Sequence, residues 1–255
     1  MKRLHILYTL LFIWLLPVTS NGQPAGKEKL RVISYNIWNG FEHDASRRAN
    51  FINWIKGQQP DILAMTELVG FTEKDLGQLA SEYGHKYYAI VKEEGYPVGF
   101  TSNEPITVVK KQVEGFWHGM LHVKTHGLDM IVTHLSPHDW KFRLKEAQML
   151  TSYIQDNQLD NCMVMGDFNA YSPFDADWVE THAQLIENMQ KWDAEQEAYR
   201  NMRDGRFDYS VLSKFLSIGL TDICRLYVPA DKRTTFPAAF LYAVSYTHLT
   251  LPTIR

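Results

Sequence analysis

The sequence predicts an α+β fold in which strands and helices alternate along the chain. Short apolar runs of strand length recur between residues 30 and 169, and several of the segments between them carry apolar residues at helical spacing. The chain has 255 residues, of which 45% are apolar, so it can bury a large core in either one domain or two. Its 7 Trp, 13 Tyr and 13 Phe residues argue against a disordered chain.

Each predicted element follows from a local pattern. A helix is predicted where apolar residues share one face, as Phe51, Ile52 and Ile55 do, and it ends at the Gly-Gln-Gln-Pro run of residues 57–60. A tight hairpin is predicted where His126-Gly127 separates two alternating runs. The predicted helices cover residues 45–56, 72–83 and 139–156. The predicted strands cover residues 30–37, 62–65, 87–91, 98–101, 107–113, 120–125, 128–135 and 163–169.

Residues 174–215 interrupt this alternation and predict a helical insertion between strands. Trp178, Leu185, Met189 and Trp192 can form one apolar stripe among many charges, and a second stripe follows it. Two roles stay open for this insertion. It can be a packed cover on the surface, or a lid that shapes a substrate groove.

Polar residues follow four of the apolar strands at the point where each strand ends. They are Asn36, Glu67 and His134 after three strands, and both Asp167 and Asn169 after the fourth. Asp167 and Asn169 are two positions apart, so in an extended chain their side chains lie on one face. We expect these strands to bring two carboxylates, two amides and one imidazole to a single rim of the molecule.

Residues 1–22 have the pattern of an export signal. Lys2 and Arg3 precede an apolar run at residues 6–16, and small or polar residues follow, so cleavage is predicted before Gln23. The apolar run is too short to span a bilayer, although an uncleaved anchor stays an alternative. We therefore expect an exported protein that is periplasmic or extracellular after cleavage.

Several motifs resemble those of the endonuclease/exonuclease/phosphatase superfamily, the group that includes deoxyribonuclease-I-like nucleases, neutral sphingomyelinases and inositol polyphosphate phosphatases. The motifs stand in the family's order, and their number makes the resemblance specific. They are RVISYNI around Asn36, PDILAMTE ending at Glu67, GFTSNEPI at residues 99–106, IVTHL around His134, MGDFNA around Asp167 and Asn169, GLTD at residues 219–222 and TTFP at residues 234–237.

This resemblance implies a four-layer α/β/β/α sandwich of two packed mixed β-sheets flanked by helices, formed by one domain at residues 23–243. It places the active site at the rim of the sheets. It also implies a phosphoester substrate and a divalent metal cofactor, Mg²⁺ or alternatively Mn²⁺. We expect a monomer with no stable protein partner.

The chemistry of phosphoester hydrolysis gives each rim residue a hypothetical role. A phosphodiester anion repels an attacking hydroxide, so hydrolysis needs a divalent cation, a group that orients or deprotonates water, and a group that stabilises the leaving oxygen. Glu67 and Asn36 are the predicted metal ligands, because Mg²⁺ prefers oxygen ligands and needs few carboxylates. Asp167 is the predicted water-orienting base, with His134 and Asn169 as further catalytic residues. The predicted contacts to the substrate phosphate come from Asn36, Asn169 and His134.

Each of these residues also has an ordinary structural explanation. Glu67 can lie in the first turn of a helix, Asp167 and the two asparagines can form turns, and a histidine at a strand end can simply lie at the surface. The motifs taken together, and not any one residue, therefore carry the functional prediction.

We expect an exported, Mg²⁺-dependent phosphoester hydrolase of the phosphodiesterase or nuclease type, in which water attacks a metal-bound phosphate in line with the leaving group. The net charge of −3 gives no basic field for nucleic acid, but a metal can supply positive charge at the phosphate. A sphingomyelinase-like or a sugar or inositol phosphate phosphatase activity is the alternative, because one fold hosts all of these. A non-catalytic phosphate- or glycan-binding module is the alternative of another class.

The chain departs from the family pattern at its end. Family members carry an Asp-Tyr strand and a terminal Ser-Asp-His after the TTFP-like element, and this sequence has neither. Residues 244–255 instead resemble a translated sequencing-adapter tail, so we expect a non-native tail on an incomplete domain. Missing strands leave sheet edges without partners, so we expect this exact chain to fold poorly and be inactive, with the activity belonging to its full-length parent.

Two further patterns are discounted as sites. Asp208-Tyr209 imitates the missing Asp-Tyr strand, but it precedes GLTD and TTFP, so we interpret it as a decoy. His118, His122 and His126 recur every fourth residue, which in a strand and hairpin marks one sheet face and not a metal site.

Other candidate ligands and links stay open. His138 follows His134 by four residues, but Pro137 prevents the helix that would bring both onto one metal, so His138 is kept as a candidate groove residue. A disulfide between Cys162 and Cys224 is compatible with export but cannot be deduced from the sequence.

Overall fold

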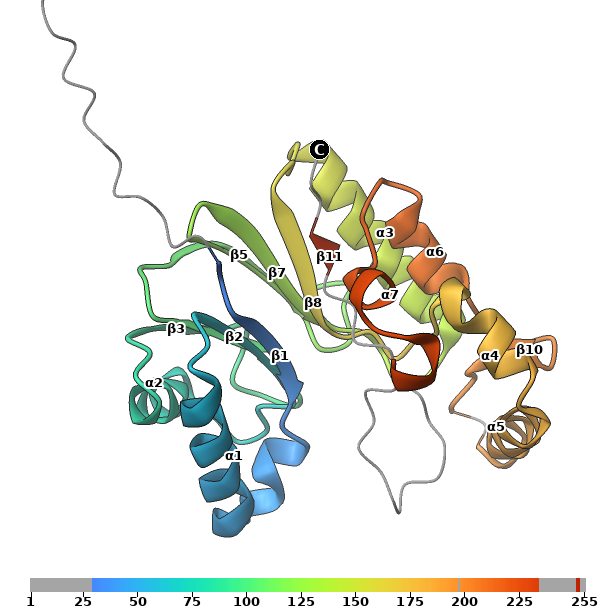
Figure 1. Ribbon diagram of the computed structural model, residues 1–255, viewed down its shortest axis with the longest axis horizontal. Helices are drawn as coiled ribbons and strands as arrows, with labels where there is room; N and C mark the ends of the chain where they lie inside the picture. Colours follow the sequence, from blue (N-terminus) through green and yellow to red (C-terminus); the bar gives the residue numbers. More distant parts are fainter. Residues whose placement is uncertain (1–28, 197, 234–250, 253–255) are drawn as a thin grey trace, which may run out of the picture.

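Two β-sheets pack face to face, and helices cover their outer faces (Figure 1). The structure is a computed structural model that describes residues 29–196, 198–233 and 251–252. Each sheet contains both parallel and antiparallel pairs of strands. The predicted α+β sandwich of two mixed sheets flanked by helices is therefore confirmed.

The first sheet has the strand order β1-β2-β4-β3. β1 (Val32–Asn36) and β2 (Ile62–Thr66) are parallel, whereas β4 (Gly99–Ser102) runs antiparallel to β2 and to β3 (Tyr87–Ile90). A parallel pair needs a crossover connection, and α1 (Ala45–Gln58) supplies it. β1 and β2 therefore end at the same edge of the sheet.

The second sheet repeats this arrangement further along the chain. β5 (Thr107–Gln112), β6 (Met120–Thr125) and β7 (Leu128–His134) run antiparallel in succession. The crossover helix α3 (Trp140–Asp156) then allows β8 (Cys162–Asp167) to pair parallel with β7. β7 and β8 thus also end at a common edge.

Helix α2 (Glu73–Glu82) begins at a reciprocal cap. The Thr72 hydroxyl accepts from the backbone N–H of Asp75, and the Asp75 carboxylate accepts from the backbone N–H of Thr72. The cap satisfies two backbone donors and ends the loop that follows β2 at a defined residue.

The turn between β6 and β7 is the predicted tight hairpin, and this prediction is confirmed. His126 and Gly127 have φ of 51° and 74°, the left-handed backbone that a two-residue hairpin turn requires. The resulting register pairs Met120 with Thr133. The residues just before β6 therefore lie beside the end of β7.

Three apolar layers hold the four structural layers together. Leu63 and Met65 of β2 pack against α1 and α2, whereas their neighbours Ile62 and Ala64 face the second sheet. On the other side, Val164 of β8 packs in a cluster with α3. Strands buried on both faces carry apolar residues without a break, which is why these segments are apolar runs in the sequence.

The segment predicted as a helical insertion contains helices and one short hairpin. Leu185 and Met189 are buried in a cluster of their own, but Trp192 is 50% exposed, so the predicted apolar stripe stops before it. Val211 and Phe215 pack in the cluster that contains α3, so the last helix covers the second sheet. The elements are η2 (Pro173–Asp175), α4 (Ala176–Glu180), α5 (Ala183–Glu195), β9 (Met202–Arg203), β10 (Arg206–Phe207) and α6 (Ser210–Leu216).

Three shorter helices complete the described elements. Asp222 caps the first turn of α7 by accepting from the backbone N–H of Arg225. The helices are η1 (Asn39–His43), α7 (Ile223–Tyr227) and η3 (Ala230–Lys232).

The two ends of the chain are described only in small part. The predicted export signal at residues 1–22, the TTFP motif and most of the predicted tail lie outside the described residues. Leu251–Pro252 form β11, antiparallel to β8 opposite Met163 and Val164. In the described part of the chain, no helix combines the length and the apolar character needed to cross a bilayer.

We predict that Gly166→Ala destabilises the protein by about 3 kcal/mol or more. Gly166 has φ of 129°, and a Cβ added there would lie 1.8 Å from the backbone oxygen of Thr133 in the neighbouring strand. Backbone in a buried sheet cannot move aside cheaply. Urea unfolding monitored by circular dichroism measures the change.

Gly57→Ala is the matched control for this substitution. Gly57 is exposed in α1, and an added Cβ would meet no atom within 4 Å. We expect it to stabilise the protein by up to about 1 kcal/mol, because alanine has the higher helix propensity. Equal stability of the two variants would show that β7 and β8 do not need this close approach.

Candidate active site

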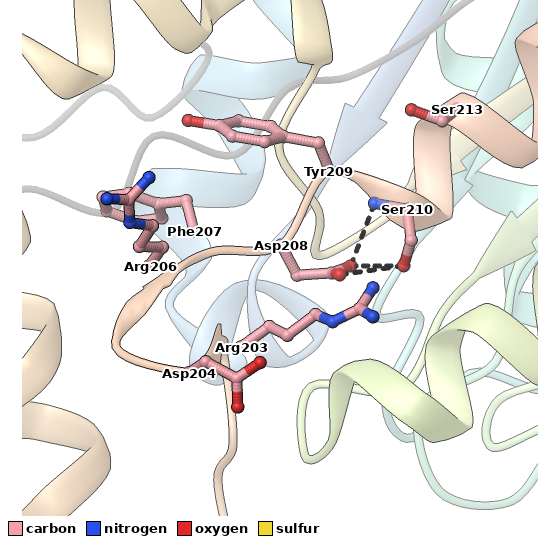
Figure 2. A pocket seen from close by; sticks show the side chains of 8 residues that line it. All are labelled: Arg203, Asp204, Arg206, Phe207, Asp208, Tyr209, Ser210 and Ser213. Atoms are coloured by element: carbon pink, nitrogen blue, oxygen red, sulfur yellow. Dashed lines mark hydrogen bonds between the residues drawn. The ribbon is translucent and has the colours of Figure 1, made fainter.

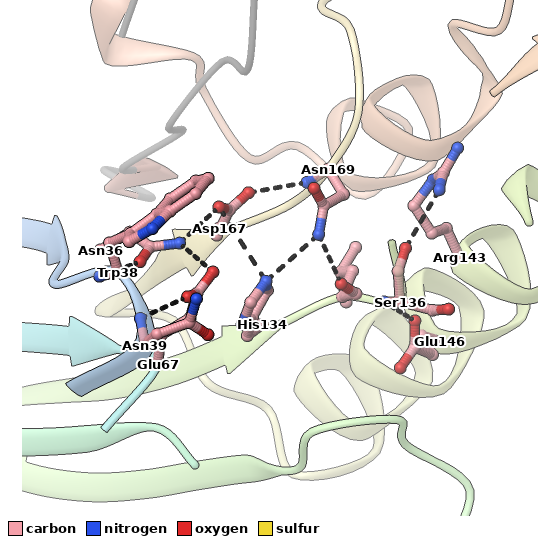
Figure 3. Close-up of polar contacts among 11 residues, drawn as sticks. Asn36, Trp38, Asn39, Glu67, His134, Ser136, Arg143, Glu146, Asp167 and Asn169 are labelled. Atoms are coloured by element: carbon pink, nitrogen blue, oxygen red, sulfur yellow. Dashed lines mark hydrogen bonds and ion pairs between the residues drawn. The ribbon is translucent and has the colours of Figure 1, made fainter. Parts of the chain in front are cut away.

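The carboxyl ends of four strands meet at one edge of the packed sheets (Figure 3). Asn36 ends β1 and Glu67 directly follows β2, while His134 ends β7 and Asp167 ends β8. Asn169 lies two residues further on. Parallel pairing within each sheet explains the meeting, because parallel neighbours end at a common edge. The structure brings all five predicted rim side chains into one hydrogen-bonded group.

One amide group joins the two sheets. Nδ2 of Asn36 donates to Oε1 of Glu67 at 2.8 Å and to Oδ2 of Asp167 at 3.0 Å. Oδ1 of Asn36 accepts from the backbone N–H of Trp38 at 2.8 Å, which identifies the nitrogen end of the amide. In this arrangement Asn36 positions both carboxylates, and its oxygen faces Trp38. Its predicted role as a metal ligand stays a prediction.

A loop with left-handed backbone holds Glu67. Oε2 of Glu67 accepts from the backbone N–H of Asn39 at 2.8 Å, and the Glu67 carbonyl accepts from the N–H of Gly40 at 2.8 Å. Glu67 itself has φ of 60°, and every residue from 38 to 43 has φ between 49° and 66°. Side-chain-bearing residues adopt this region at a cost on the order of 1 kcal/mol each, and such strain clusters at functional sites.

Asp167, Asn169 and His134 form a second group, which is more deeply buried than Glu67. Oδ1 of Asp167 accepts from the backbone N–H of Asn169 at 3.0 Å, and Oδ2 lies 3.9 Å from Nε2 of His134. The Asn169 side-chain nitrogen donates to the Leu135 carbonyl at 2.9 Å and contacts Nε2 of His134 at 3.2 Å. Because an amide nitrogen only donates, Nε2 of His134 is the acceptor in this contact with Asn169.

His118 packs directly on His134, a contact that was not predicted from the sequence. The two rings are stacked, with centroids 4.2 Å apart and planes 23° apart. Burial, followed by the neighbouring His134, lowers the pKa of His118 to about 2, so this ring is neutral. The signal was present in the sequence, because a two-residue turn at His126-Gly127 places the residues before β6 opposite the end of β7.

The other two histidines of the every-fourth-residue pattern lie elsewhere. His122 contacts the Tyr153 hydroxyl at 2.8 Å and Asp129 at 2.7 Å, and burial is the main cause that lowers its pKa. His126 lies in the hairpin turn beside Asn103. The structure therefore separates the three side chains among three environments.

A buried carboxylate that the sequence analysis missed organises the loops around His134. Both oxygens of Glu146 accept backbone N–H groups, Oε1 from Trp117 at 2.8 Å and Oε2 from Ser136 at 2.8 Å. Arg143 donates to the Ser136 carbonyl at 3.0 Å (Figure 3). Glu146 lies in the middle of α3, where a charged residue is indistinguishable in sequence from one on the solvent face. It ties the loop before β6 to the loop after β7.

Asp208 belongs to a different part of the molecule. Its carboxylate accepts from the backbone N–H and the hydroxyl of Ser210, which is a turn at the start of α6 (Figure 2). A hollow of about 410 Å³ opens there, lined by Arg203, Asp204, Arg206, Phe207, Asp208, Tyr209, Ser210 and Ser213. In the described bonds, Asp208 caps a turn, and its interpretation as a decoy stays a prediction.

A family model with the description Endonuclease/Exonuclease/phosphatase family matches residues 33–215, which is more than half of the chain. The chain belongs to this family. Its members are hydrolases that act on phosphoester bonds, so the predicted family and the predicted hydrolase class are confirmed. No curated protein sequence matches the chain significantly.

Several solved structures have a similar fold. An AP endonuclease from Archaeoglobus fulgidus has a TM-score of 0.60 and 19% identity over 88% of this chain and 87% of its own. A 3′-5′ exonuclease (NExo) from Neisseria meningitidis has a TM-score of 0.62 and 18% identity over 86% of each chain. D. rerio TDP2, complexed with a single-strand DNA product, has a TM-score of 0.58 and 14% identity over 90% of this chain and 86% of its own. At these identities the likeness establishes the fold.

The donor set of this family member fits a hard divalent cation. Among the described residues, no three His, Cys, Asp or Glu side chains converge as a metal cage. Mg²⁺ does not require one, because it keeps several waters and binds through one or two carboxylates. Glu67 is half-buried, and the amide that links it to Asp167 is neutral, so this link positions the two carboxylates without adding a charge.

We predict that Glu146 makes the stability of the protein fall as pH rises. Burial raises the pKa of Glu146 from 4.5 to about 7, so the native state keeps a proton that the unfolded chain releases. The stabilisation is complete below pH 4.5 and is lost as the pH passes through about 7. Between these limits, the free energy of unfolding of the wild type should drop relative to that of Glu146→Gln by on the order of 2 kcal/mol.

Urea unfolding of both proteins at a series of pH values measures this difference. Glu146→Gln keeps the shape of the side chain and cannot titrate. It is therefore the reference for the wild type at each pH. Parallel stability profiles would mean that Glu146 titrates at its ordinary pKa in the folded protein.

Proposed function

We propose that the protein is an exported, Mg²⁺-dependent phosphodiesterase that cleaves nucleic acid by in-line attack of water on the phosphate. The supporting observation is the Asn36 amide that holds Glu67 and Asp167 at one point beside His134 and Asn169. This arrangement provides two negative charges for a cation and water, with donors and an imidazole around them. DNA substrates are proposed because one structural neighbour is an AP endonuclease and another is complexed with single-strand DNA.

In this proposal each side chain performs one task. Glu67 binds the divalent ion, which when bound supplies positive charge at the phosphoryl oxygens. Asp167 orients the attacking water and accepts its proton. His134 and the Asn169 amide lie on the far side of Asp167 from Glu67, where they can contact the phosphate or the leaving oxygen. Asn36 positions the carboxylates of Glu67 and Asp167 by donating one amide hydrogen to each.

We predict that Asp167→Asn and Glu67→Gln each lower kcat/KM at least about 100-fold, because a neutral amide neither accepts the proton of water nor binds Mg²⁺ as a carboxylate does. EDTA should abolish the wild-type activity and added Mg²⁺ or Mn²⁺ should restore it. Asp156→Asn is the control, because Asp156 is exposed at the end of α3. Activity that survives EDTA, or Asp167→Asn at full rate, would contradict the proposal.

A substrate panel separates the proposed nuclease from the other phosphoesterases. A nuclease should cleave an oligonucleotide and lose affinity as salt rises, whereas a phosphatase of small sugar or inositol phosphates should not lose affinity in this way. A preference for sphingomyelin would identify the lipid phosphodiesterase alternative. Binding of phosphate or glycan without turnover would identify the non-catalytic alternative.

The assays use two proteins, because residues 244–255 are expected to be non-native. One is the 255-residue chain, and the other is the product of its gene sequenced beyond codon 243. A second protein that carries a downstream Asp-Tyr strand and a terminal Asp-His should have the higher activity. A stop codon directly after the present tail would favour the binding module instead.

We also propose export through the predicted signal at residues 1–22. Expression with this segment should give a periplasmic or secreted protein whose N-terminus begins at Gln23, because the segment has a charged start, an apolar run and small residues before the cut. N-terminal sequencing of the exported protein tests this. Retention of Met1 on a membrane-associated protein would identify an uncleaved anchor.

A further inference from the structure

A second hollow, of about 570 Å³, lies between the loop before β6 and the first turns of α3. None of the five rim side chains lines it. Its wall combines exposed aromatic and cationic groups, and its position is next to the loops that hold the site. The lining residues are Trp117, Ser136, His138, Asp139, Lys141, Phe142 and Lys145.

Flat rings form one wall of this hollow, which we call the aromatic groove. The rings of Trp117 and His138 are 4.4 Å apart, and His138 is stacked on Tyr199 at 4.7 Å with planes 15° apart. Phe142 contacts Trp117 edge-on at 6.0 Å. Trp117 is 47% exposed, which is a large area for an indole that is fixed by its neighbours.

The charges at the aromatic groove favour an anionic ligand. Lys141 and Lys145 are exposed on α3, one turn apart on the same helix face. The carboxylate of Asp139 accepts from the backbone N–H of Lys141 at 2.6 Å, where it caps the helix. The Lys141 ammonium lies 5.6 Å from the centre of the Trp140 ring and the Lys145 ammonium lies 6.0 Å from that of Phe142. The groove lining thus has two cations, and its one carboxylate is engaged as a helix cap.

The aromatic groove is physically continuous with the candidate active site. Glu146 accepts backbone N–H groups from both Trp117 and Ser136, which line the groove. The residue after Trp117 stacks on His134, and the residue before Ser136 accepts from Asn169 through its carbonyl. The rings and the site are thus carried by the same two loops.

We propose that the aromatic groove binds a nucleotide that flanks the scissile phosphate of a single-stranded nucleic acid. A base stacks on the exposed face of Trp117 beside His138, and a backbone phosphate lies near Lys141 and Lys145. Stacked rings with nearby cations match the alternation of bases and phosphates in a single strand, whereas a phospholipid headgroup or a sugar phosphate offers no flat ring. This inference deepens the proposed function and rests on it for the location of the scissile bond.

Binding without turnover tests the proposal. A fluorescein-labelled oligothymidylate of about ten nucleotides is titrated with the protein in EDTA, and anisotropy gives Kd. Trp117→Ala should raise Kd about tenfold, since one base stacked on an aromatic ring contributes that much or more. The matched control is Trp192→Ala, because Trp192 is equally exposed, at 50%, but lies on α5. It should leave Kd unchanged.

The lysines are tested separately through salt dependence. Replacing Lys141 and Lys145 together by alanine should lower the slope of log Kd against log salt by roughly one, because each phosphate contact releases counterions. Lys191→Ala on α5 is the control for a single exposed lysine and should leave the slope unchanged. An oligomer of the same length without bases should bind the wild type and Trp117→Ala with equal, weak affinity.

The outcomes separate this inference from the proposed function. Equal Kd values for Trp117→Ala and Trp192→Ala, no binding by the wild type, or equal binding of strands with and without bases would overturn the inference. Hydrolysis of bis(p-nitrophenyl) phosphate with Mg²⁺ tests the catalytic proposal independently. If the product of the gene sequenced beyond codon 243 binds as expected but cleaves no phosphodiester, the groove is kept and the proposed nuclease activity is contradicted.

Discussion

The candidate site depends on one interaction, the pair of hydrogen bonds by which the Asn36 amide holds a carboxylate from each sheet. Asn36 and Glu67 belong to the first sheet, and Asp167 belongs to the second. Their meeting therefore requires the two sheets to pack in one register, which the apolar layer between them enforces. Gly166 adds a local condition, because only a residue without a Cβ lets β8 approach Thr133 so closely, one residue before Asp167.

In the described part of the chain, amide and imidazole side chains contact these carboxylates or lie beside them. Asn36 and Asn169 are amides, His134 accepts at Nε2, and buried His118 is held neutral beside it. A lysine or arginine in these places would pair with the carboxylates and compete with a metal ion for them. Amides position the carboxylate oxygens through hydrogen bonds and add no charge of their own. Carboxylate oxygens held in this way are the hard oxygen ligands that Mg²⁺ prefers.

The strands could be predicted from the sequence because their apolar pattern is local. The rim could also be predicted, because its residues stand at or just after strand ends. They are Asn36, Glu67, His134, Asp167 and Asn169. What could not be predicted depends on tertiary packing. Glu146 resembles any helical glutamate until α3 is placed against two loops. The prediction that Trp192 belongs to an apolar stripe was wrong because it also depends on tertiary packing. Helical spacing puts residues on one face of a helix, but it does not supply a surface for that face to pack against. The left-handed loop at residues 38–43 has no local signal apart from Gly40.

Rigid strands and variable loops have different tasks in this architecture. The rim residues come from strand ends, which the family motifs share, whereas the aromatic groove comes from the loop before β6 and the start of α3. One fold can therefore keep its hydrolytic chemistry and change its substrate by changing loops alone. Here Glu146 joins the aromatic groove to the rim. Its carboxylate accepts from the backbone N–H of Trp117 in the groove and from that of Ser136, which is two residues from His134. The loop that carries the groove's Trp117 and the loop that follows His134 are therefore held together by one buried side chain.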